Sequence, residues 1–163
     1  MSPSRISKAS ADVRVIVVGG SASKVGKTTL ACALVRREPG LCVAMKVSVT
    51  ERDVPTYVSV ERGSENERHG DTGRLLDAGA SAVVWVTVSR RRVRDGLARG
   101  LQNARALRPQ VLIIESTSAG IQLRHFESSW FVAGSGAWKP WAAEHRDRAT
   151  RVVASRSLIS AAS

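Results

Sequence analysis

The chain has 163 residues, 43% of them hydrophobic, which fits one folded domain with a sizeable core and excludes wholesale disorder. No apolar run reaches the ~20 residues of a membrane-spanning helix, and residues 1–12 lack the apolar segment of a secretory signal. The formal net charge of +11 favours anionic partners: nucleic acid, an anionic surface or nucleotides. We expect a cytoplasmic protein with a disordered lead over 1–12, one domain over 13–155 and a tail over 156–163.

The segment 13–30, VRVIVVGGSASKVGKTTL, joins an apolar strand to a glycine-containing loop and then to a helix. This order is typical of a phosphate-binding loop, in which backbone N–H groups and the positive end of a helix converge on an anion. The common spacing GxxxxGK[ST] would place glycine where Ser21 stands, so the spacing here is G-x5-GKT. We expect ATP or GTP to bind at Gly20, Ser21, Ala22, Ser23, Lys24, Val25, Gly26, Lys27, Thr28 and Thr29.

Within this loop, two side chains have separate predicted roles. Lys27 is expected to reach the β- and γ-phosphates, and Thr28 to offer its hydroxyl to Mg²⁺. Lys24 either touches phosphate or faces solvent.

Short apolar strands and helices alternate along the rest of the chain, which predicts βαβ units around a mostly parallel central sheet. The fold class is therefore α/β with flanking helices, as in P-loop NTPases. A long polar loop is expected over 47–70, with a short strand inside it, and a flexible turn over 116–120. Cys32 and Cys42 are expected as buried free thiols. The expected strands are 13–18, 41–45, 57–60, 82–88, 111–114, 130–132 and 151–154, and the expected helices are 28–37, 71–79, 93–107 and 140–148, with one more turn in the tail.

The densest basic cluster is the run 89–94, SRRRVR, between a predicted strand and a predicted helix. No aromatic residue interleaves with it to give a stacking platform for bases. We interpret the cluster as a solvated basic turn, and nucleic acid is the least favoured partner.

Ligands of parallel α/β sheets bind at the carboxyl ends of the strands, where this chain places Lys46 and Glu115 directly after apolar runs. Glu115 either holds Mg²⁺, orients an attacking group, or pairs with an arginine. Lys46 either binds a γ-phosphate or an acidic substrate, or extends to the surface. Asp71 is either a helix N-cap or a second carboxylate near the metal. The candidate catalytic residues are Lys27, Lys46 and Glu115, and the candidate metal ligands are Thr28, Asp71 and Glu115.

These motifs resemble the SIMIBI branch of P-loop NTPases, and within it the molybdopterin-guanine dinucleotide biosynthesis protein B (MobB) family. Four segments carry the resemblance, in chain order: 15–30, 43–46, 71–80 and 111–115. The dethiobiotin synthetase family is a second relative, with a similar G-x5-GKT loop. In that family the lysine after the second strand serves the substrate and the glutamate serves the metal, which implies these roles for Lys46 and Glu115.

The chain departs from these families directly after Lys46 and directly after Glu115: Val47 stands where MobB has a histidine, and Ser116 stands where the family has a glycine. No Asn-Lys-x-Asp motif is present, so no preference for GTP over ATP follows.

The resemblance implies Mg²⁺-dependent binding and hydrolysis of ATP or GTP in cofactor biosynthesis. Two alternatives stay open: an ATP-dependent ligase or kinase acting on a small acidic metabolite, and a nucleotide-bound adaptor for a partner enzyme. Whether the chain forms a homodimer is open as well.

Overall fold

The computed structural model describes residues 12–38, 40–63 and 70–161, which form a seven-stranded sheet between helices. The strand order is β3-β4-β2-β5-β1-β6-β7, and every pairing is parallel except the antiparallel pair β3–β4. The prediction of a mostly parallel α/β sheet is confirmed. The strands are β1 (Arg14–Gly20), β2 (Cys42–Thr50), β3 (Tyr57–Arg62), β4 (Ala82–Ser89), β5 (Val111–Glu115), β6 (Ser128–Ala133) and β7 (Arg151–Ala154).

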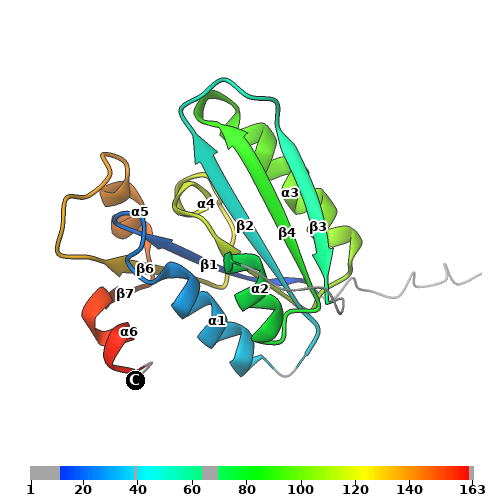
Figure 1. Ribbon diagram of the computed structural model, residues 1–163, viewed down its shortest axis with the longest axis horizontal. Coiled ribbons are helices and arrows are strands. Elements are labelled where there is room, and N and C mark those ends of the chain that lie inside the picture. The colour runs from blue at the N-terminus through cyan, green and yellow to red at the C-terminus, as the bar shows by residue number, and fades with distance from the viewer. Residues whose placement is uncertain (1–11, 39, 64–69, 162–163) are drawn as a thin grey trace, which may run out of the picture.

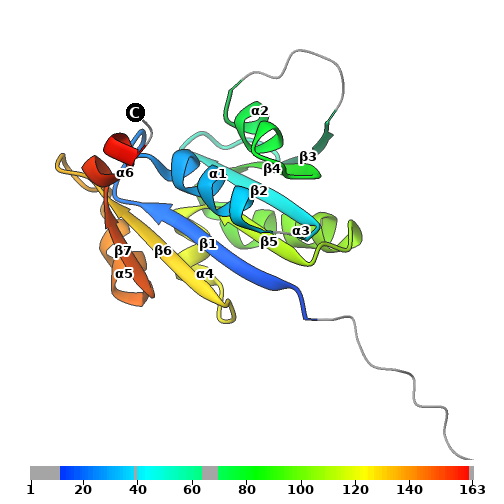
Figure 2. The same cartoon turned by 90° about the horizontal axis from the view of Figure 1, so that it is seen from below.

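Helices cover both faces of this sheet (Figures 1 and 2). One face carries α1 and α2, with Leu158 of α6 packed against the same core; the other carries α3 and α4, with α5 beside them. Both cores consist mainly of buried aliphatic side chains, as expected for a sheet covered on its two faces. The helices are α1 (Lys27–Arg37), α2 (Gly70–Asp77), α3 (Val93–Ala106), α4 (Thr117–Gln122), α5 (Ala142–Arg148) and α6 (Ser155–Ala161), with a 3-10 turn, η1 (Arg90–Arg92), before α3.

The strand β5 lies at the centre of the sheet and is buried along its whole length. Its last residue, Glu115, is in register with Val18 of β1 on one side and Lys46 of β2 on the other. The sheet therefore brings Glu115 and Lys46 to the same edge as the loop that follows β1.

The strand β2 is longer than the sequence predicts. It continues past Lys46 to Thr50, where it pairs only with β4, so the expected loop over 47–50 is wrong. The alternation VSVT explains the extension, because Val47 and Val49 pack against the α3-side core while Ser48 and Thr50 point to the other face. The strand expected at 57–60 is confirmed as β3.

Two short segments also differ from expectation. The turn predicted over 116–120 is the buried helix α4, whose first residues are capped by Ser116 Oγ, which accepts a hydrogen bond of 3.0 Å from Ala119 N. Asp71 lies in the first turn of α2, which begins at Gly70, so it is not the N-cap. The predicted lead falls outside the described residues, apart from Asp12.

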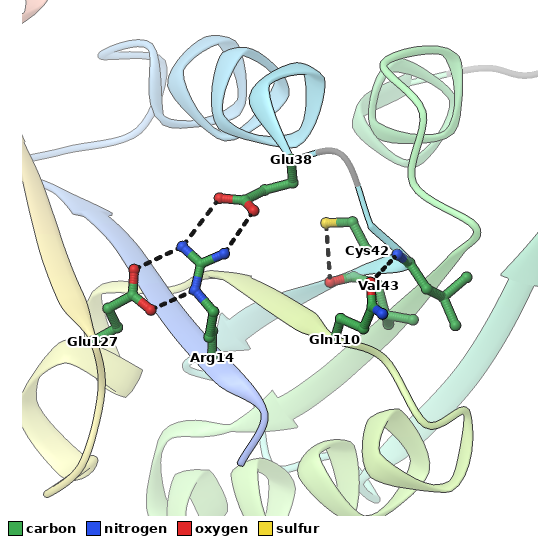
Figure 3. A network of polar contacts seen from close by, with 7 residues as sticks. Arg14, Glu38, Cys42, Val43, Gln110 and Glu127 are labelled. Atoms are coloured by element: carbon green, nitrogen blue, oxygen red, sulfur yellow. Dashed lines mark hydrogen bonds and ion pairs between the residues drawn. The ribbon is translucent and has the colours of Figure 1, made fainter. Parts of the chain in front are cut away.

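At the opposite end of the sheet, Arg14 links three elements (Figure 3). Its guanidinium donates to both carboxylate oxygens of Glu127, at 2.6 and 2.8 Å, and to Glu38 at the end of α1, at 2.9 Å. Hydrogen bonding to Arg14 lowers the pKa of Glu127. Because the arginine is exposed, solvent and salt screen this network and it adds little to stability.

The two cysteines are buried free thiols, as predicted. Burial raises the pKa of Cys42 to about 12, so this thiol stays neutral and unreactive.

Candidate functional site

The segment that ends β1 and leads into α1, which we call the glycine loop (residues 19–26), depends on three glycines. A Cβ at Gly19 would lie 2.1 Å from His145 Nδ1, and one at Gly20 would lie 2.7 Å from Val25 Cγ2. Gly26 has φ +109°, a left-handed conformation that other residues adopt only with strain. The glycines thus let the chain fold back closely between the sheet and α1.

The helix α1 begins without a cap of its own. Its first backbone hydrogen bond runs from Leu30 N to Gly26 O, so the N–H groups of the preceding residues have no acceptor inside the helix. No side chain caps this end, and no acidic residue lies in the first turn. Free N–H groups and the positive end of the helix dipole make this end favourable for an anion.

A cavity of about 570 Å³ opens directly above this helix end, over the carboxyl ends of the strands. It is lined by residues of the glycine loop and α1, by the second half of β2, by two residues of α2, by the last residue of β5, and by residues that follow β4, β5 and β6. The lining residues are Ser23, Lys24, Gly26, Lys27, Thr28, Thr29, Lys46, Val47, Ser48, Val49, Asp71, Arg74, Arg90, Glu115, Ser116, Thr117, Ser118, Lys139 and Trp141.

Six of the ten predicted nucleotide-binding residues therefore line the cavity, and Gly20, Ser21, Ala22 and Val25 do not. Ser21 has a different task. Its backbone N–H donates to Val132 O at 3.0 Å, and its Oγ accepts from Gly134 N at 2.8 Å. It therefore anchors the glycine loop to the end of β6.

The three predicted metal ligands lie together in this cavity. Thr28 Oγ1 donates to Glu115 Oε1 at 2.7 Å, and Thr28 also contributes to the lowered pKa of Asp71. Glu115 is 5% exposed, and its Oε2 has no hydrogen-bond partner in the described part of the chain. A buried carboxylate oxygen without a partner is costly, so this atom points to a missing cation or donor.

These donors fit Mg²⁺ better than a transition metal. Mg²⁺ is held by one or two carboxylates, with phosphates and water completing its coordination. Groups of three or more His, Cys, Asp and Glu side chains able to hold a metal are absent from residues 12–38, 40–63 and 70–161.

Lys46 contacts a protein carboxylate directly: its ammonium group forms an ion pair with Asp71. Burial acts to raise the pKa of Asp71, but the hydrogen bond and charge of Lys46, together with Arg74 and Thr28, outweigh it and lower the pKa. Arg74 also donates to Thr29 Oγ1 at 2.9 Å. Lys46 and Arg74 therefore keep Asp71 ionised beside the first turn of α1.

Lys27 lies near charged side chains of both signs. Burial and the charge of Lys139 lower its pKa, Lys46 adds to the effect, and Glu115 and Asp71 oppose it. A lysine whose charged form is disfavoured in this way gains most from an anionic ligand. Lys24, also at the cavity, is exposed and has φ +59°.

Sequence reasoning missed several residues of the cavity, among them Arg90, Lys139 and Trp141. The guanidinium of Arg90 lies 3.6 Å from the ring centroid of Trp141. The interpretation of 89–94 as a solvated turn is therefore wrong for Arg90, whereas Arg91 and Arg92 are exposed and pair with Asp53. No local signal links Arg90 to an aromatic residue 51 positions later in the sequence.

The rarity of lysine was a usable signal. The chain has five lysines, and Lys24, Lys27, Lys46 and Lys139 all line the cavity. The remaining one, Lys8, lies outside the described residues.

Comparison with known proteins gives no match: no family model, no curated protein and no solved structure matches this chain. In the part of the chain that the structure describes, the helices are too short or too polar to cross a membrane. The function must therefore be inferred from the cavity itself.

Proposed function

We propose that the protein is a Mg²⁺-dependent nucleoside triphosphatase that binds ATP or GTP at the glycine loop. The single observation that carries this proposal is the buried Glu115, whose Oε1 accepts from Thr28 at the start of α1 while its Oε2 has no partner among the described residues. A carboxylate, a hydroxyl and an uncapped helix end meet at one point, which suits a metal–phosphate pair.

Each residue then has a defined role. The N–H groups at the start of α1 and the ammonium of Lys27 hold the phosphates and stabilise charge that builds up on them. Thr28 and Glu115 would hold the metal, and Asp71, fixed by Lys46, supplies a second negative charge beside it. A bound Mg²⁺ would neutralise part of the charge of the phosphates. The resemblance to MobB supports a place in cofactor biosynthesis.

The proposal is tested by measuring phosphate release from ATP and GTP. Glu115→Gln should retain nucleotide binding but lower turnover at least about tenfold, because the amide cannot replace the metal-binding charge. Glu144→Gln, an exposed glutamate of α5, is the control and should turn over normally. Unchanged turnover in Glu115→Gln would remove Glu115 from the mechanism.

One alternative remains tied to an observation: phosphoryl transfer to a small acid in place of water, since cationic side chains continue beyond the glycine loop. Transfer of one phosphoryl group to a metabolite per nucleotide consumed would distinguish this reaction from slow hydrolysis. If nucleotide binds without turnover and the protein forms a stable complex with another enzyme, the adaptor role is favoured instead.

A further inference from the structure

The cavity extends well past the glycine loop. The strand β2 loses its pairing with β5 after Lys46 and runs on to Thr50 beside β4 alone. Figure 1 shows β2, β4 and β3 projecting beyond the end of β1. Val47, Ser48 and Val49 of this projecting part line the cavity.

Arg90 lies at the far end of this projecting part of the sheet. It follows β4, which lies three strand positions from β1 in the sheet. Neighbouring strands are about 4.8 Å apart, so the backbone at Arg90 is displaced by roughly 14 Å from that of the glycine loop. Phosphates held at the start of α1 are therefore distant from the backbone of Arg90.

Arg90 is held in place before any ligand arrives. Its guanidinium stacks on Trp141, and its Nε and Nη2 both lie 2.6 Å from Glu51 Oε1. Among the described residues its Nη1 has no hydrogen-bond partner. An arginine fixed on one face and one edge, with donors left over, is preorganised to bind an oxyanion.

Lys139 joins the same part of the cavity. Its backbone N–H donates to Ser21 O at 2.8 Å, and its ammonium lies 5.9 Å from the ring centroid of Trp141. The segment after β6 thus carries both Lys139 and Trp141 across the carboxyl ends of the strands, toward Arg90.

The charge of the cavity exceeds what a nucleotide neutralises. Six cationic side chains line it, against the carboxylates of Asp71 and Glu115 and that of Glu51, which pairs with Arg90. A magnesium-bound triphosphate has lost part of its charge to the metal, so it leaves cationic side chains uncompensated. The cationic side chains are Lys24, Lys27, Lys46, Arg74, Arg90 and Lys139.

We propose that Arg90, Lys139 and Trp141 form a second binding site, for a small organic acid that carries a carboxylate or a phosphate ester and binds beside the nucleotide. The site rests on the proposed function only in that the nucleotide fills the glycine loop. Arg90 Nη1 and Lys139 Nζ supply the donors, and Trp141 fixes the guanidinium.

The test is calorimetric titration of succinate and of glycerol phosphate into the protein, with the glycine loop saturated by the magnesium complex of a non-hydrolysable ATP or GTP analogue. The two probes distinguish a carboxylate site from a phosphate site. Arg90→Gln should weaken binding of the preferred probe about tenfold or more, the effect of losing a charged hydrogen bond. Arg91→Gln, the exposed neighbour in η1, should bind it normally.

Binding of neither probe to the folded wild-type protein would overturn the proposal and leave the nucleotide site untouched. Equal losses in Arg90→Gln and Arg91→Gln would also overturn it, because they would show a diffuse charge effect. If Arg90→Gln weakens binding of the nucleotide analogue as much as binding of the probes, Arg90 belongs to the nucleotide site and the proposal of a second site is wrong.

If the analogue does not bind at all, the proposed function fails and the titration is repeated on Lys27→Ala without nucleotide. Probe binding that still depends on Arg90 would then support the second site, and its absence would overturn it. Circular dichroism shows that each variant is folded, and quenching of fluorescence that disappears in Trp141→Phe places the probe at this ring.

Discussion

His145 provides a quantitative test of the packing beneath the glycine loop. Its side chain is fully buried on α5, with the ring edge-on to Phe131, 5.6 Å between centroids. Nε2 lies 2.8 Å from Ser129 Oγ, while Nδ1 has no partner among the residues described. The ring fills the space left by the missing side chains of Gly19 and Gly120.

Burial, followed by the charges of Arg148 and Lys27, lowers the pKa of His145 from 6.5 to about 4. The unfolded chain, with the ordinary pKa, therefore binds a proton at a higher pH than the folded protein does. The stability contributed by the neutral ring is complete above pH ~6.5 and is lost as the pH falls towards 4. The difference between the two pKa values corresponds to about 3 kcal/mol of unfolding free energy in total, of which about 2 kcal/mol is lost by pH 5.

The assay is urea denaturation of the wild type, His145→Gln and His125→Gln at pH 7.5, 6 and 5. His145→Gln will be less stable at pH 7.5, but its disadvantage should shrink by about 2 kcal/mol at pH 5, because it has no proton to take up. The exposed His125→Gln should follow the wild type. Parallel profiles for the wild type and His145→Gln would refute a buried neutral histidine.

Two further predictions concern the glycine loop. Gly19→Ala should lower the free energy of unfolding by about 1–3 kcal/mol, because its Cβ would overlap the His145 ring. Gly136→Ala, with open space around it, should have little effect. Thermal melts compare the two variants, and equal melting temperatures would contradict the packing of His145 against Gly19. Nucleotide binding should take up protons at alkaline pH below the ordinary lysine pKa of 10.5, because phosphate raises the lowered pKa of Lys27 again. Calorimetry in buffers of different ionisation enthalpy measures the uptake, and its absence across this pH range in the wild type would exclude this role for Lys27.

The fold was predictable because its signals are local. A few consecutive residues are enough to predict the secondary structure of the apolar runs such as β5 and β4, and of the glycines and GKT at the start of α1. The predicted element boundaries were wrong where contacts with distant segments determine them. β2 extends to Thr50 because β4 is beside it to accept its hydrogen bonds, and α4 forms because its small residues pack under the sheet.

The candidate site was also predictable only in part, namely where its residues directly follow a predicted strand. Glu115 and Lys46 follow buried strands, and the rule for parallel sheets brings them to one edge. The ion pair of Lys46 with Asp71 needed the position of α2, which no spacing in the chain encodes. Likewise, the contact of Arg90 with Trp141 joins segments that follow β4 and β6, on opposite sides of the central strands.

The central claim, that the glycine loop binds a magnesium nucleoside triphosphate, is tested most directly by calorimetric titration of ATP and GTP into wild type and Lys27→Ala, with Mg²⁺ and with EDTA. The account predicts that at least one triphosphate binds the wild type, more weakly in EDTA, and that Lys27→Ala, folded by circular dichroism, loses this binding. Absence of binding by both nucleotides, or equal affinity in Lys27→Ala, would contradict it.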